Sequence, residues 1–231
     1  MTSFPADLIS NYRRLNSQMA LDWHTRAATT RTAMRFILDQ YDGSQADFYA
    51  SGAKHWNDMK DALSKVGISP HGIAVEVGCG IGRMTGHIAQ EFDKVYATDI
   101  AANMIVKCPH IANVEFICTD SLDVVPSGVD FVLSLIVFQH VPKVVFWNYV
   151  AESYHILKPG GIFCTQLPEG TADWPDNETL GVRAYTKEEL KANIRGEDYD
   201  ILSLLGKAGI SEDWNWFILR RTGEAYRHGG Q

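Results

Sequence analysis

Apolar residues recur at helical intervals through the first quarter of the chain. A spacing of three or four residues places side chains on one face of a helix, so we expect two or three helices over residues 5–66. The polar run 40–45 predicts a loop between two of them, and Ser51-Gly52 predicts a second break. The apolar positions are Leu8, Tyr12, Leu15 and Met19, then Ala33, Phe36 and Ile37, then Trp56, Met59, Leu63 and Val66.

From residue 73 onward, short apolar runs typical of strands alternate with helical segments. The run 129–141 is the most apolar of the chain, and we interpret it as a central buried strand that lies beside the first one. A long polar excursion over 168–198 contains a helix that begins at Thr186 with a capping box, Thr-Lys-Glu-Glu. The other predicted strands are 73–77, 94–99, 114–118, 162–165 and 213–221; helices are predicted up to about 92, from 101, and over 152–157.

Three glycines, Gly78, Gly80 and Gly82, follow the first strand directly and precede a helix. A residue without Cβ turns at positive φ and lets a ligand approach the amides at a helix start. The stretch therefore predicts a nucleotide pocket. Dinucleotide-binding folds favour Gly-x-Gly-x-x-Gly, but the position of their third glycine is Arg83 here.

Asp99 ends the second strand, about 20 residues after the glycine loop. Its two carboxylate oxygens can accept hydrogen bonds from both ribose hydroxyls of a nucleotide. Adenosine cofactors with and without nicotinamide are bound in this way, so Asp99 supports a nucleotide site without deciding which nucleotide it holds.

The ordered set of motifs resembles the class I S-adenosylmethionine (SAM)-dependent methyltransferases. In chain order it comprises the glycine loop with Glu76 two residues before it, Asp99, Asp120, the buried run 129–141 and Leu-Lys-Pro-Gly-Gly over 157–161. The resemblance implies an α/β fold, a Rossmann-like three-layer αβα sandwich with a seven-stranded, mostly parallel sheet. It also implies a helical cap or lid over residues 1–68 and a SAM-binding core over 69–231, in which 168–198 covers the acceptor.

The same resemblance assigns the cofactor-binding residues. Ile100 is placed against the adenine face, and Asp120, with Ser121 beside it, accepts a hydrogen bond from the adenine amino group. Asp120 is equally well explained as a turn or helix-capping residue. The full set is Glu76, Gly78, Cys79, Gly80, Gly82, Asp99, Ile100, Asp120, Ser121 and Leu135.

A general base is needed only for some acceptors, and His140 is our first candidate because histidine titrates near neutral pH. A structural role at a strand end explains His140 equally well. Weaker candidates for the base are His24, Tyr185 and Glu169. Candidates for the lid are Tyr12, Trp23 and His24, although aromatic side chains more often pack in a core.

Composition restricts the partners. The chain has 231 residues, and 21 basic against 28 acidic residues give a net charge of −7, which argues against binding nucleic acid. The 4 cysteines form no Cys-x-x-Cys pair, and Ser134 and Leu135 stand where metal-dependent relatives carry an aspartate, so we expect no metal. No apolar run is long enough for a membrane span and residues 1–7 do not resemble a signal peptide, so we expect a cytoplasmic protein without membrane contact.

The expected activity is transfer of the sulfonium methyl of SAM to an O or N nucleophile, less readily to C or S, with release of S-adenosylhomocysteine (SAH). A small acceptor, aromatic or like a natural product, fits the aromatic-rich cap. The protein is expected to be a monomer or homodimer. Two alternatives stay open, an NAD-dependent oxidoreductase and a SAM-binding protein that transfers no methyl group.

Overall fold

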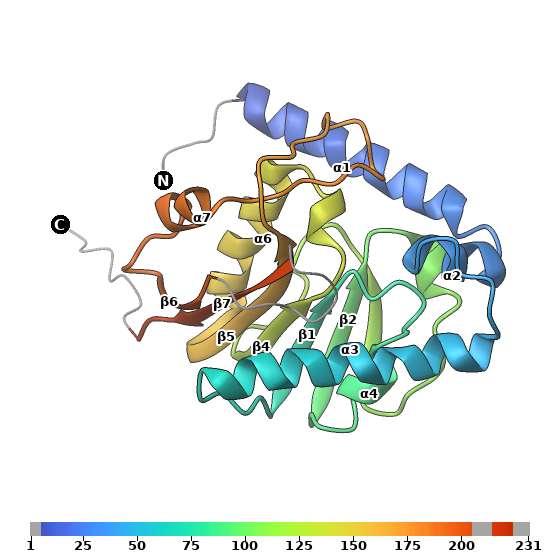
Figure 1. The fold of residues 1–231 in the computed structure, drawn as a ribbon, viewed down its shortest axis with the longest axis horizontal. Helices are drawn as coiled ribbons and strands as arrows, with labels where there is room; N and C mark the ends of the chain where they lie inside the picture. Colours follow the sequence, from blue (N-terminus) through green and yellow to red (C-terminus); the bar gives the residue numbers. More distant parts are fainter. Residues whose placement is uncertain (1–5, 205–213, 224–231) are drawn as a thin grey trace.

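The computed structural model describes residues 6–204 and 214–223. In this part of the chain seven strands form one sheet with the order β3-β2-β1-β4-β5-β7-β6 (Figure 1). The strands are β1 (Ile73–Val77), β2 (Lys94–Asp99), β3 (Val114–Cys118), β4 (Val129–Ser134), β5 (Leu157–Pro168), β6 (Tyr199–Ser203) and β7 (Trp214–Arg221).

The five strands from β3 to β5 are parallel to their neighbours, whereas β7 runs antiparallel to both β5 and β6. The predicted seven-stranded, mostly parallel sheet is confirmed. β1 lies between β2 and β4, so the carboxyl ends of three strands meet at the centre of one sheet edge. Ligands bind at this edge of open α/β sheets, outside the point where the strand order reverses.

Helices cover both faces of the sheet (Figure 1). On one face α1 (Ala6–Arg26) and α6 (Lys143–Ile156) bury Leu15, Phe146 and their neighbours in a common core with the sheet. On the other face α3 (Gln45–Lys65) and α4 (Thr85–Ile88) do the same through Trp56, Leu63 and Ile88. The remaining helices are α2 (Thr30–Ile37), α5 (Ala102–Ile105), α7 (Lys187–Asn193) and the 3-10 helix η1 (Phe138–His140). None of the described helices is long and apolar enough to cross a membrane.

The break predicted at Ser51-Gly52 is wrong, because both residues lie inside α3. A Cβ on Gly52 would stand 2.2 Å from the carbonyl oxygen of Arg83. Glycine is needed there for close packing of α3 on the glycine loop, a role that costs the helix roughly 1 kcal/mol relative to alanine but does not end it. The loop predicted over 40–45 lies between α2 and α3 up to residue 44, and Gln45 begins α3.

The apolar run 129–141 is only partly a strand. β4 ends at Ser134, and the chain then turns through Ile136, whose φ is +57°. Residues 135–141 leave the sheet and lead through η1. Most of them form one wall of a cavity at the end of the sheet. A continuous apolar run has no period from which this turn could be predicted.

Candidate functional site

A cavity opens at the carboxyl ends of β1, β2 and β4, with an empty volume of about 1090 Å³ that includes its mouth. One side is polar and is formed by the ends of β1 and β2. The other side is apolar and aromatic. Its lining includes Met19, Trp23, Phe36, Ile37, Glu76, Gly78, Cys79, Gly80, Arg83, Asp99, Ile100, Leu135, Val137, His140, Val141 and Tyr149.

The glycine loop forms the floor of this cavity. Gly78, Gly80 and Gly82 all have positive φ, as the sequence predicts for a tight turn. A Cβ on Gly78 would lie 2.5 Å from the Val137 side chain, so this glycine also allows the chain beyond β4 to approach. The backbone N–H groups of Gly78 and Cys79 both donate to the carbonyl of Thr98, at 2.8 and 2.9 Å, which fixes the loop on the end of β2.

Asp99 stands at the end of β2, beside this loop. Its Oδ2 accepts the N–H of Gly80 at 2.9 Å and its Oδ1 accepts the N–H of Ala101 at 2.9 Å. Each oxygen therefore keeps a lone pair for a further donor. Burial raises the pKa of Asp99 to about 6, against the lowering effect of these backbone donors.

Glu76 is 5% exposed and points from β1 into the same cavity. The hydroxyl of Thr85 at the start of α4 donates to its Oε2 at 2.6 Å. Burial raises the pKa of Glu76 to about 7, although the Thr85 hydrogen bond and the charge of Arg83 both lower it. A cationic ligand group nearby would therefore favour the ionised form.

The apolar side of the cavity comes largely from the first two helices. Met19 and Trp23 of α1 and Phe36 and Ile37 of α2 line it. Ile37 lies so close to the glycine loop that a Cβ on Gly80 would be 2.8 Å from its Cδ1. Helices α1 and α2 thus cover the site, whereas α3 belongs to the layer on the opposite face of the sheet.

His140 lines the cavity next to Trp23, with the ring centroids 5.9 Å apart. Its Nδ1 lies 3.2 Å from the carbonyl oxygen of Gly181, which requires a proton on Nδ1, and its Nε2 lies 3.1 Å from the side-chain nitrogen of Gln139. Burial lowers the pKa of His140, and the charge of Arg183 lowers it further. The ring is therefore neutral at pH 7 with its basic nitrogen on Nε2.

The excursion after β5 holds His140 in place. Arg183 is fully buried and donates through Nη1 to the carbonyl of His140 at 3.1 Å and through Nη2 to that of Pro175 at 2.6 Å. The excursion also reaches α1, because Thr179 accepts from Arg26 at 2.7 Å and donates to Asp22 at 2.9 Å.

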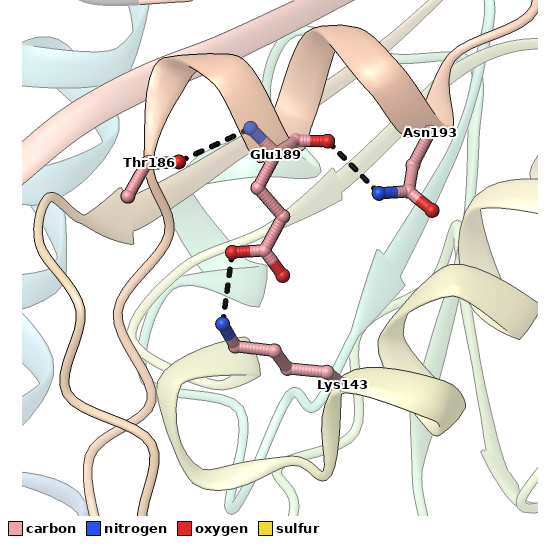
Figure 2. A network of polar contacts seen from close by, with 4 residues as sticks. All are labelled: Lys143, Thr186, Glu189 and Asn193. Carbon is pink, nitrogen blue, oxygen red and sulfur yellow. Dashed lines mark hydrogen bonds and ion pairs between the residues drawn. The ribbon is translucent and has the colours of Figure 1, made fainter.

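The excursion ends in α7, which is anchored on α6 (Figure 2). Thr186 caps α7 by accepting the N–H of Glu189 at 3.1 Å, which is one half of the capping box predicted from the sequence. The Glu189 carboxylate pairs with Lys143 at 2.8 Å, and Asn193 donates to the Glu189 carbonyl at 2.9 Å. Because Lys143 begins α6 shortly after η1, this contact closes the excursion next to His140.

Asp120 and Ser121 do not line the cavity. Asp120 is exposed, and its Oδ2 accepts a hydrogen bond from Asn16 of α1 at 3.0 Å. Ser121 donates to Glu152 of α6 at 3.1 Å. Tyr12 joins the same polar group, because Asn148 donates to its hydroxyl at 3.1 Å. These contacts fasten α1 to the core.

The other predicted residues are dispersed. The structure places Gly82 against Pro109 and Phe116, away from the cavity. His24 is exposed, and its carbonyl accepts from Asn103. Tyr185 is 1% exposed and packs on Phe146, with ring centroids 4.9 Å apart, and burial raises its pKa. Glu169 accepts from Asn215 at 3.1 Å. Among the four candidates for the base, only His140 reaches the cavity.

Comparisons with known proteins identify this architecture. A family model described as a methyltransferase domain matches residues 74–161, from β1 through the Pro-Gly-Gly segment. Over these residues the chain matches a methyltransferase domain. The family prediction made from the sequence is confirmed. No curated protein sequence matches the chain.

Solved structures with bound SAH share the fold over nearly the whole chain. DhpI in complex with SAH is 20% identical, with a TM-score of 0.62, and the alignment covers 91% of this chain and 98% of DhpI. Magnesium protoporphyrin IX methyltransferase (ChlM) from Synechocystis PCC 6803 is 13% identical, with a TM-score of 0.64 and coverage of 89% and 100%. The N-methyltransferase NodS from Bradyrhizobium japonicum WM9 is 14% identical, with a TM-score of 0.60 and coverage of 88% and 98%. At these identities the neighbours establish the fold.

Tyr149 and Arg83 are among the lining residues that sequence reasoning missed. Tyr149 is one of many aromatic residues in α6, and nothing in the sequence marks it as facing a cavity. Arg83 follows the third glycine directly, a position that could have marked it as a site residue. In residues 6–204 and 214–223 no group of three or more His, Cys, Asp or Glu side chains is arranged to hold a metal ion.

Proposed function

We propose that this protein binds SAM and transfers its methyl group to an oxygen or nitrogen atom of a small, flat acceptor, with release of SAH. One observation carries the proposal: the glycine loop, Asp99 and His140 line one continuous cavity that the aromatic residues of α1 and α2 cover. The residues present fit the cofactor, because Asp99 keeps a free lone pair on each oxygen for the two ribose hydroxyls.

The cavity divides between cofactor and acceptor. The nucleoside and methionine parts of SAM would lie along Gly78, Gly80 and Asp99, with Ile100 against the adenine ring. Asp120 remains a prediction for the adenine amino group; its Oδ1 accepts no hydrogen bond within the described structure, whereas Oδ2 is held by Asn16. The acceptor would lie against Trp23, Phe36 and Tyr149, which favours an aromatic or other apolar ring system.

Bound SAM supplies an activated methyl group on a sulfonium ion, so the protein acts chiefly by alignment and exclusion of water. The bound cofactor would supply this methyl group to a lone pair of the acceptor and would leave as SAH, with the electrons of the former carbon–sulfur bond on sulfur. For a hydroxyl acceptor, Nε2 of His140 would take the proton in place of its contact with Gln139. The neutral ring and the fixed proton on Nδ1 suit this role.

The first experiment is a thermal-shift titration with SAM, SAH and NAD in parallel, because a ligand that binds only the folded state raises the melting temperature. We expect stabilisation by SAM and SAH and none by NAD. Stabilisation by NAD alone would contradict the proposal. An acceptor screen that reads SAH release follows; SAM binding without release for any acceptor would favour a SAM-binding protein without transferase activity.

The NAD-dependent alternative is disfavoured by the sheet. Dinucleotide-binding folds have six parallel strands in the order 3-2-1-4-5-6. Here the antiparallel β7 lies between β5 and β6. Arg83 also occupies the place where the dinucleotide motif needs glycine for helix packing.

A further inference from the structure

Arg83 is a buried cation that faces the cavity without an anionic partner among the residues that the structure describes. It is 5% exposed and lines the cavity beside Glu76. Its only side-chain hydrogen bond within residues 6–204 and 214–223 runs from Nη1 to the Ser51 hydroxyl, at 3.3 Å, and its Nε is buried without an acceptor. No carboxylate oxygen of the described chain lies within 4.0 Å of its nitrogen atoms. Buried charges are normally paired, so this arrangement calls for an anion from outside the protein.

The guanidinium is held in position rather than free to reach solvent. Helix α3 carries both Ser51 and Phe48, and the Arg83 Cζ lies 6.0 Å from the centre of the Phe48 ring. Close packing at Gly52 fixes the backbone of Arg83 against the same helix. Burial lowers the pKa of Arg83 to about 10, which leaves it charged at neutral pH.

Arg83 and Glu76 together form a pair of opposite charges that do not touch. The charge of each affects the pKa of the other, yet Glu76 bonds Thr85 instead of Arg83. An amino-acid group, with one carboxylate and one ammonium, complements such a pair. SAM carries one amino-acid group, on its methionine portion, and that carboxylate is its only anionic group.

We propose that Arg83 binds the methionine carboxylate of SAM and thereby makes this protein select sulfonium and thioether nucleosides that carry an amino acid. The inference rests on the proposed function of the cavity and adds a specificity residue to it. Arg83 would also anchor the end of the cofactor opposite the ribose, so that the methyl group is aligned from both sides of the sulfur.

The test compares SAH with S-adenosyl-3-thiopropylamine, which is SAH without its carboxylate, by isothermal titration calorimetry. Hydrogen bonds to charged groups are worth about 1.5–3 kcal/mol, so the wild type should prefer SAH roughly 10- to 100-fold. Arg83→Met should weaken SAH binding by that factor and leave the affinity for the decarboxylated analogue unchanged. Arg83→Lys should retain part of the preference, since it keeps the charge but loses the two-pronged geometry.

Arg35→Met is the matched control, because Arg35 is an exposed arginine of α2 next to the cover. It should leave the preference for SAH unchanged. A wild type that binds both ligands equally would overturn the assignment even if Arg83→Met does not fold. The assignment would also be overturned if Arg83→Met kept the wild-type preference for SAH over the decarboxylated analogue. It would likewise be overturned if Arg35→Met lost this preference as fully as Arg83→Met.

The outcome also separates this inference from the proposed function. Methylthioadenosine lacks the whole amino-acid portion and serves as a third ligand. If the wild type binds none of the three nucleosides, the proposed function fails and the role of Arg83 fails with it. If the wild type binds all three with equal affinity, only the role of Arg83 is lost.

Discussion

The backbone N–H of Gly80 donates a hydrogen bond of 2.9 Å to the Asp99 carboxylate, across the gap between β1 and β2. This contact joins the two features that the sequence singled out separately, the glycine loop and the acidic strand end. This one hydrogen bond both orients the Asp99 side chain toward the cavity and restrains the glycine loop. The site is therefore ordered before a nucleotide binds, which reduces the entropy cost of binding.

The first prediction concerns this contact. Asp99→Asn replaces one acceptor oxygen by a donor, so the ribose loses a charge-assisted hydrogen bond and SAH affinity should fall roughly 10- to 100-fold. Calorimetry measures the change, with the exposed Asp123→Asn as the control for removing one charge. The 2′-deoxyribose analogue of SAH should be penalised in the wild type but much less in Asp99→Asn. An equal penalty in both proteins would refute a ribose contact.

The second prediction concerns pH and stability. The pKa of Glu76 is raised to about 7 in the folded protein, so the folded state holds this proton more tightly than the unfolded state. Its ionisation therefore costs stability as pH rises from about 4.5 to 7. Relative to Glu76→Gln, which keeps an acceptor for Thr85, the wild type should lose unfolding free energy between pH 5 and pH 8. Urea titrations at the two pH values measure the difference in unfolding free energy between the wild type and Glu76→Gln. If the pKa of Glu76 were normal, this difference would be the same at both pH values.

The third prediction concerns His140. With a hydroxyl acceptor, His140→Gln should reduce kcat by roughly 10²- to 10⁴-fold, the usual contribution of a general base. SAH affinity should not change, because the predicted cofactor contacts lie elsewhere. In the wild type kcat should rise with pH through a value below the ordinary pKa of histidine, since burial lowers it. Undiminished turnover in His140→Gln would leave His140 with a structural role only.

The fourth prediction concerns Arg183, whose side chain donates to three backbone carbonyls, those of His140, Pro175 and Glu178. Arg183→Met leaves these carbonyls without their donor and should destabilise the protein by about 2–5 kcal/mol. Chemical denaturation measures the loss, and Arg183→Lys should recover part of it. Arg183 is fully buried and lies outside the cavity lining, so its loss should affect stability rather than ligand contacts. If Arg183→Met is as stable as the wild type, the excursion over 168–198 is held in place by its other contacts.

How far the sequence predicts this protein depends on the range of the interactions involved. β1, β2 and β3 lie where their apolar runs predict, and the glycine loop turns at positive φ as its composition requires. These features follow from neighbouring residues, because strand pattern and turn geometry are local. The position of Asp99 beside the glycine loop is also predictable from the sequence, because the carboxyl end of β2 lies next to that of its parallel neighbour β1.

The errors arise where distant segments meet. Gly52 reads locally as a helix break, yet it serves the close approach of Arg83. The apolar residues after Ser134 read as more strand, yet they leave the sheet to line a cavity. In both places the decisive neighbour is remote in sequence, so local pattern carries no information about it.

The site divides in the same way. The sequence by itself predicted the glycine loop, the acidic residue beside it and the likeness to methyltransferases, because these rest on short motifs in a recognisable order. Only the tertiary structure decided that His140 reaches the cavity while His24, Tyr185 and Glu169 do not, and that Asp120 contacts Asn16. It also decided that Arg83 faces the cavity, bonded to Ser51 but with no carboxylate partner among the described residues. Burial and pairing depend on what the rest of the chain places around a side chain, and that is settled only when the chain is folded.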